Sequence, residues 1–411
     1  MSVRELRARI AKLDTEIDIQ RELLKKLERD KSLIQRQLNK LIDPVARLPL
    51  EISSEIFLQC MWPFPDIYYG AHNVPMLLLN ISHAWTDIAL STPALWSAIN
   101  IAFPCPSGLK ELLPIWLERA RNRPLSISLE VRERFDEEVV AIVWGHGQQM
   151  KHLQVFEEEI RDRRWSIEEM IPGQLPALQT LTMRGEAFTR RYILQLLRLA
   201  PNLIEYVVYD TRIDPDDVEK VVLPQLRRLA FGEPGGYPCS DQELLEYLSL
   251  PVLEALQLET SGRGLLAFLK QSSPPLLELI LKSTKDIIDF VALAEYVAGL
   301  IRLEVWFPKQ QEVETLFAVL ASQSLLLHLH TLIIHLDLYR PSQNSDDFWT
   351  ALVHALAARR TQIQVFRLMV PLRLPDSLTP ASDIAAAIQE LRTDGMHVSI
   401  SATHETWSLF D

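Results

Sequence analysis

The chain has 411 residues, of which 48% are hydrophobic and 23% charged, a composition typical of folded proteins that excludes wholesale disorder. Its net charge of −12 excludes a general attraction to nucleic acid or to anionic membranes. Only 13 glycines occur, less than half of average usage, which disfavours the Gly-rich loops that cradle phosphate groups.

Residues 1–42 carry a heptad pattern, because apolar residues alternate at spacings of three and four with breaks at Gln20 and Lys31. β-Branched residues at the early a positions and Leu at the early d positions favour a parallel two-stranded coiled coil, as do the opposite charges of Glu16 and Arg21 beside the seam. We therefore predict one long helix and a parallel homodimer. The predicted dimer contacts include Ile10, Leu13, Ile17, Leu24 and Leu27. Packing of this helix on another protein or on the body of its own chain is the alternative.

Residues 43–100 read as a small module of three helices. Asp43-Pro44 ends the long helix, and a short helix is expected after Pro49 with one apolar face. After a Pro- and aromatic-rich insert at 62–75, residues 76–90 read as a second helix, and residues 92–96 close the module.

The apolar residues of this module carry a family resemblance. The segments Leu48-Pro49-x-Glu51-Ile52, Leu77-Leu78-Leu79 with Trp85, and Thr92-Pro93-x-Leu95-Trp96 together resemble the F-box-like domain common in basidiomycete fungi. The resemblance implies docking to the Skp-type adaptor of a cullin-RING ubiquitin ligase through Leu48, Pro49, Ile52, Ile56 and Phe57. The chain departs from the family pattern at Ser53, at residues 81–84 and in the insert. The alternative is that the apolar residues only form the core of a helical domain.

Residues 150–411 contain a repeated motif, Pro-x-Leu-x-x-Leu-x-Leu, whose first Leu stands at 178, 203, 226, 253 and 276, with versions lacking the Pro that begin at 300, 329 and 363. Most of these steps match leucine-rich repeats. We predict an α/β fold, an irregular leucine-rich-repeat solenoid with parallel strands inside and helices outside. Residues 101–149 are predicted to connect to it and cap its N-terminal side.

The strand residues between the repeated leucines are candidates for binding a partner, because only they are free of the core. Apolar and aromatic residues among them are the predicted contacts with a target protein: Tyr209, Ile280, Trp306 and Ile333. The alternative is that the C-terminal units curl, or that the register slips by one residue, so that these side chains belong to the core and the leucines do not.

No residue pattern predicts chemistry. The sequence lacks the common phosphate-binding, nucleophile and zinc-protease motifs, and His328, His330 and His335 read as ordinary strand histidines. Cys60, Cys105 and Cys239 are odd in number and far apart, which favours a reducing compartment. We expect no catalytic residue, metal or cofactor. With neither a signal peptide nor a membrane span in view, we expect a cytoplasmic or nuclear protein.

Two classes of function follow. The first is the substrate-recognition adaptor of an SCF-type ubiquitin ligase, in which the F-box-like module docks the Skp-type adaptor and the solenoid binds the target protein. The second is a non-enzymatic scaffold with a coiled coil, leucine-rich repeats and a degenerate F-box. An enzyme is a third hypothesis, which would require a pocket with convergent titratable groups.

Overall fold

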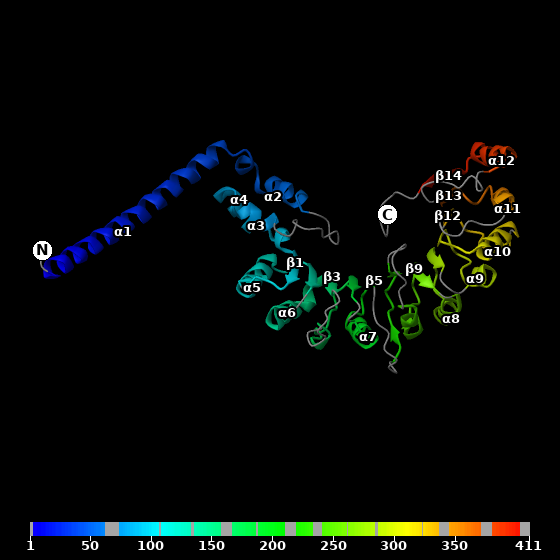
Figure 1. Cartoon of the computed structure of the whole chain (residues 1–411), viewed down its shortest axis with the longest axis horizontal. Helices are drawn as coiled ribbons and strands as arrows, with labels where there is room; N and C mark the ends of the chain where they lie inside the picture. Colours follow the sequence, from blue (N-terminus) through cyan, green and yellow to red (C-terminus); the bar gives the residue numbers. More distant parts are fainter. Residues whose placement is uncertain are drawn as a thin grey trace. The chain divides into compact units, whose positions relative to one another are not determined.

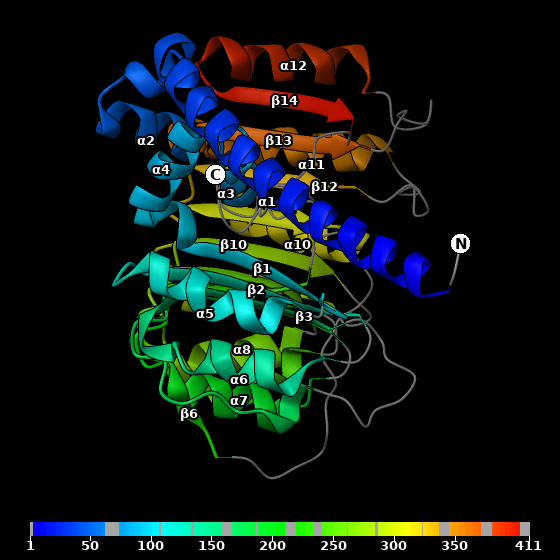
Figure 2. The same cartoon turned by 90° about the vertical axis from the view of Figure 1, so that its left-hand side faces the viewer.

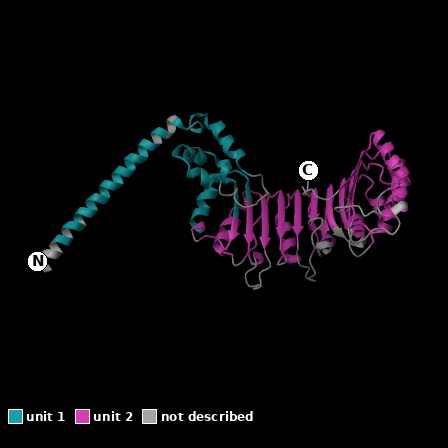
Figure 3. Cartoon of the chain, turned by 45° about the horizontal axis from the view of Figure 1, so that its top comes forward, with its two compact units in different colours: residues 1–100, 110–126 teal, residues 101–109, 127–411 magenta. Residues whose placement is uncertain are grey.

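The computed structural model describes residues 3–61, 74–106, 108–132, 135–157, 167–185, 188–209, 219–232, 241–260, 262–283, 287–322, 324–336, 345–370 and 380–402. The chain forms two compact units (Figure 3). Unit 1 comprises residues 1–100 and 110–126, and unit 2 comprises residues 101–109 and 127–411. No helix in the described ranges combines the length and the apolarity needed to cross a bilayer.

Unit 1 begins with the expected long helix and continues with short ones. Its helices are α1 (Val3–Ile42), α2 (Leu50–Gln59), α3 (Val74–Leu79), α4 (His83–Ser91) and α5 (Leu109–Ala120, of which Leu109 belongs to unit 2), with the 3-10 turns η1 (Val45–Arg47) and η3 (Pro93–Trp96). The single helix predicted over residues 76–90 is wrong, because the chain breaks between α3 and α4. Ser82 adopts an extended conformation there and its hydroxyl accepts a hydrogen bond from Trp85 N at 3.3 Å, which starts α4 as an N-cap.

Aromatic contacts join the helices of unit 1. The rings of Phe57 and Trp85 lie 4.9 Å apart and join α2 to α4. Trp96 is buried, its Nε1 donates to the carbonyl of Ala89 at 2.9 Å, and its ring meets Trp116 of α5 edge-on at 4.9 Å. These contacts close the small helices around a common interior.

A 12-stranded sheet has its strands in chain order, β1-β2-β3-β4-β5-β7-β9-β10-β11-β12-β13-β14 (Figure 1). From β3 to β14 every neighbouring pair runs parallel, as predicted. The strands are β1 (Ala98–Phe103), β2 (Leu125–Val131), β3 (Met150–Glu157), β4 (Thr180–Arg184), β5 (Glu205–Tyr209), β7 (Arg228–Phe231), β9 (Ala255–Thr260), β10 (Glu278–Ser283), β11 (Arg302–Trp306), β12 (Thr331–His335), β13 (Val365–Val370) and β14 (His397–Ala402). β6 (Val221–Val222) and β8 (Leu248–Ser249) form a separate parallel ribbon.

Helices connect the strands of unit 2 and lie along one face of the sheet (Figures 1 and 2). They are α6 (Glu137–Trp144), α7 (Arg190–Leu199), α8 (Gly262–Ser272), α9 (Phe290–Tyr296), α10 (Gln310–Ala321), α11 (Ser345–Ala358) and α12 (Ser382–Thr393). The segment between β7 and β8 contains a 3-10 helix, η7 (Asp241–Tyr247). The fold is therefore α/β with a large parallel sheet, as expected.

The repeated leucines form the core of unit 2. Leu256 of β9 pairs in register with Leu279 of β10, which pairs with Leu303 of β11 and, through it, with Leu332 of β12. All four are buried at no more than 1% exposure, so the register that places the leucines against the helices is confirmed. The slipped register is wrong.

Candidate functional site

One candidate surface is a stripe on unit 1, here called the α2 stripe, formed by Leu48, Ile52 and Ile56. Ile52 and Ile56 are spaced by four and lie on one side of α2, and Leu48 lies in the extended segment just before the helix. Their exposed fractions are 41, 50 and 41%, which leaves about half of each apolar side chain in water. Pro49 stands at the N-cap of α2 with φ −54° and ψ 144°, and its ring stiffens the approach to the helix.

Phe57 differs from the other predicted docking residues because it is only 1% exposed. Its ring packs on Trp85, so it holds α2 against α4 from the interior. The prediction that Phe57 contacts an adaptor directly is not compatible with this burial. The α2 stripe remains accessible, and Phe57 positions the helix that carries Ile52 and Ile56.

A network around Asp43 supports the same helix. Asp43 Oδ2 accepts from Trp85 Nε1 at 2.7 Å, and Asp43 Oδ1 accepts from Val45 N at 3.0 Å. The buried hydroxyl of Ser53 donates to the carbonyl of Val45 at 2.9 Å, which ties α2 to η1. Ser53, one of the departures from the family pattern, thus makes a structural hydrogen bond, and the role of Asp43 was missed because the sequence marks it only as a helix breaker.

The second candidate surface is the face of the sheet opposite the leucines, here called the open face. In register across neighbouring strands it presents Gln257, Ile280, Glu304, Ile333 and Arg367. The strands of a parallel sheet are about 4.8 Å apart, so side chains in such a row touch one another.

The predicted exposure of the open-face contacts is wrong for three residues. Ile280, Trp306 and Ile333 are 6–7% exposed, whereas Tyr209 is half-buried beside Arg184, whose guanidinium carbon lies 5.9 Å from the Tyr209 ring centre. These side chains are buried because each lies in a row across the sheet, between its neighbours on the two adjacent strands. Trp306, for example, stacks on His335 with ring centres 3.6 Å apart.

A polar group in the open face, here called the Glu304 cluster, consists of Arg302, Glu304, Trp306 and His335. Glu304 Oε1 accepts a hydrogen bond from Trp306 Nε1 at 3.0 Å and pairs with His335 Nε2 at 2.8 Å, and Oε2 accepts from Arg302 at 3.0 Å. Alternation along β11 places residues 302, 304 and 306 on one side, and β12 supplies His335. The alternation could have indicated the first three, but the pairing with β12 is a tertiary contact.

Burial raises the pKa of the Glu304 carboxyl, but the hydrogen bond and charge of His335, together with Arg302, outweigh it. The pKa of Glu304 therefore lies below its ordinary value, and the carboxylate form is the stable one. A buried carboxylate with three hydrogen-bonding partners is suited to holding those side chains in place.

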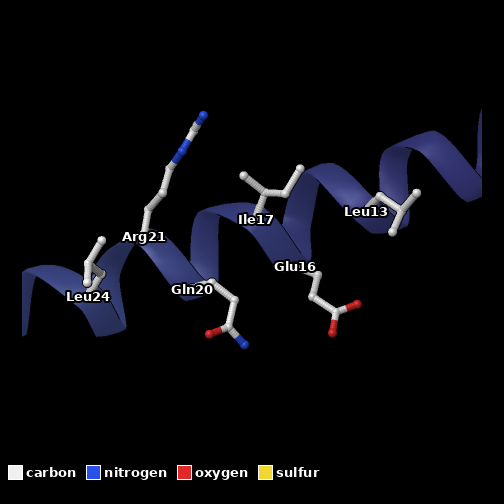
Figure 4. A pocket seen from close by; sticks show the side chains of 6 residues that line it. All are labelled: Leu13, Glu16, Ile17, Gln20, Arg21 and Leu24. Carbon is white, nitrogen blue, oxygen red and sulfur yellow. The ribbon is translucent and has the colours of Figure 1, made fainter.

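The third candidate surface is the seam of α1. Ile10, Leu13, Ile17, Leu24 and Leu27 are between 46 and 58% exposed, so the predicted dimer contacts are uncovered in the single chain. Part of this seam forms a shallow groove lined by Leu13, Glu16, Ile17, Gln20, Arg21 and Leu24 (Figure 4).

Among the residues that the structure describes, no group of three or more His, Cys, Asp or Glu side chains is placed to hold a metal ion. His328 and His330 are exposed, whereas His335 is buried. A scan against protein-family models and a search of curated proteins both give no match for the chain.

Proposed function

We propose that the chain is the substrate-recognition adaptor of an SCF-type cullin-RING ubiquitin ligase. In this proposal the module of α2, α3 and α4 docks a Skp-type adaptor, and unit 2 binds the protein to be ubiquitinated. The observation that carries it is the exposed α2 stripe beside Pro49, at the positions where the resemblance to the F-box-like family puts the docking residues. The chain itself supplies binding surfaces and no chemistry, and its place is the cytoplasm or the nucleus.

The α2 stripe is large enough to matter for such a contact. Full burial of a Leu or Ile side chain is worth about 1.5–3 kcal/mol, and the stripe residues are already about half-buried. Covering all three therefore contributes about 3 kcal/mol, which corresponds to roughly a hundredfold in affinity. Truncation of one or two stripe side chains should therefore weaken adaptor binding by a measurable factor.

For the target protein we propose the open face of unit 2, with the exposed groups making contact and the buried ones supporting them. Arg184 and Arg367 are exposed on this face, and Tyr209 is half-buried beside Arg184. Ile280, Trp306 and Ile333 then act as a rigid base rather than as protruding anchors. Loss of target binding on Tyr209→Ala with an unchanged melting temperature is the expected result.

The proposal is tested by co-purification with a Skp-type adaptor. We expect the wild-type chain to retain the adaptor, and the double variant Pro49→Ala with Ile52→Ala to lose it while the far-UV circular dichroism stays unchanged. Leu112→Ala is the matched control, because Leu112 is an exposed leucine on α5 of the same unit. If the wild-type chain does not retain the adaptor, or if the double variant binds as well as wild type, the F-box assignment fails. The non-enzymatic scaffold with a degenerate F-box is then the better description.

A further inference from the structure

We infer that α1 pairs with α1 of a second copy of this chain in a parallel, in-register coiled coil. The inference is independent of adaptor docking, which uses α2. It rests on the exposed seam, on the residues that line the groove within that seam, and on the charges that flank it.

The seam continues beyond the five predicted contacts. It includes Ile34 and Leu38, which are 64 and 47% exposed. α1 does touch α4, through Ser32 Oγ and His83 Nε2 at 3.4 Å. Ser32 is at heptad position b, well away from the a and d positions, so this contact leaves the seam open.

The groove in Figure 4 has the composition of two adjoining holes of a parallel coiled coil. In such a pair, a side chain at a inserts between d, g, a and d of the other helix, and the next d side chain inserts between a, d, e and a. Leu13, Glu16, Ile17 and Gln20 form the first hole, which receives Ile17 of the second copy. The second hole is formed by Ile17, Gln20, Arg21 and Leu24, and it receives Gln20 of the second copy.

The charges that flank the seam favour the parallel orientation. In a parallel pair Glu16 at g faces Arg21 at e of the second copy, an attraction that occurs twice. In the fully overlapped antiparallel pair, Glu16 faces Asp30 and Arg21 faces Arg21, so the same residues repel one another. All three side chains are exposed, and the pair that Arg21 makes with Asp18 of its own helix at 3.2 Å is itself exposed.

The polar seam residues also agree with the parallel register. In that register Gln20 faces Gln20 and Lys31 faces Lys31, with Asp30 of the second copy beside each Lys31 to offset their repulsion. An antiparallel pair instead sets Gln20 against Leu24 and Lys31 against Leu13. Matching polar with polar residues avoids burying an amide or an ammonium against apolar side chains.

Light scattering on the purified full chain, without adaptor, tests the dimer. We expect about twice the chain mass of 47.2 kDa for wild type and about 47.2 kDa for Ile17→Asp. Ile19→Asp is the matched control, since Ile19 is an isoleucine on the same helix, 62% exposed, at the outward position c, and this variant should stay dimeric. A monomeric wild type at a concentration of tens of micromolar, or an unchanged dimer in Ile17→Asp, overturns the inference. Because the adaptor is absent, failure here does not bear on the docking proposal.

Sedimentation equilibrium of charge variants tests the orientation. Glu16→Arg should weaken self-association roughly tenfold, because two attractions become repulsions, and adding Arg21→Glu to it should restore the wild-type value. Glu22→Arg, at the outward position f, is the control with the same charge change and should leave the dimer unaffected. If Glu16→Arg instead tightens the dimer, the introduced guanidinium has gained Asp30 of the second copy as its neighbour. The pair is then antiparallel, and the inference is wrong in its register.

Discussion

Removing the carboxylate of Glu304 is expected to destabilise unit 2 more than removal of any exposed ion-pair partner. Glu304→Ala deletes the acceptor shared by Arg302, Trp306 and His335 in a site where the glutamate is 3% exposed. The three donors are then left without this acceptor in a site where water does not replace it. Arg302 also loses its ion-pair partner, which lies two residues away on the same strand.

The magnitude follows from the three contacts. A hydrogen bond to a charged group contributes about 1.5–3 kcal/mol, and removal of one partner of a buried pair costs about 3–5 kcal/mol. Side-chain relaxation of the partly exposed Arg302 reduces the loss, so we expect about 3 kcal/mol. Glu254→Ala is the control: its pair with Arg227 at 2.6 Å is partly exposed and worth about 0–1 kcal/mol.

The assay is urea unfolding of both variants, followed by circular dichroism at neutral pH. A loss for Glu304→Ala no larger than that for Glu254→Ala refutes the reasoning. The pH dependence gives a second check, because the folded pKa of Glu304 is depressed. Its stabilisation is complete above the ordinary pKa of 4.5 and is lost as the pH falls through the folded value. The difference in stability between wild type and Glu304→Gln should therefore shrink in acid, and a constant difference counts against the ion pair.

Three further substitutions probe other contacts. Phe57→Ala should cost about 3–5 kcal/mol of unfolding free energy in unit 1 and change the fluorescence of Trp85, because it empties the core beneath α2. Arg359→Lys should lower the free energy of unfolding in urea by about 2 kcal/mol. The buried guanidinium donates to the carbonyls of Leu320 at 2.7 Å and Leu325 at 2.5 Å, and an ammonium cannot reach both. Gly185→Ala should lower the melting temperature, because Gly185 has a φ of +151° and an added Cβ would collide with the carbonyl of Glu157.

Features of the fold that repeat along the sequence could be predicted, whereas features that depend on a single residue could not. The heptads of α1 and the repeated Leu-x-x-Leu-x-Leu each signal the same structure many times, so single exceptions such as Gln20 did not obscure it. The break between α3 and α4 depends on one capping hydroxyl, Ser82, inside an apolar run that otherwise suits a continuous helix.

The candidate sites show the same division. Exposure of Ile52 and Ile56 follows from their place on a short helix, but the burial of Phe57 depends on Trp85, which is distant in the sequence. Alternation on β11 predicted the side on which Trp306 lies. It could not predict that His335 covers the indole, because that contact needs the pairing of β11 with β12.

The agreement between strand order and chain order in the sheet has an evolutionary consequence. Each strand from β3 to β13 pairs with the strands before and after it in that order, so strands paired in this sheet also follow one another along the chain, apart from β6 and β8, which form their own ribbon. Duplication or deletion of one strand with its helix would leave all the other pairings in place. The open face can therefore lengthen or shorten by whole units, which lets such a chain acquire new surface without rebuilding its core.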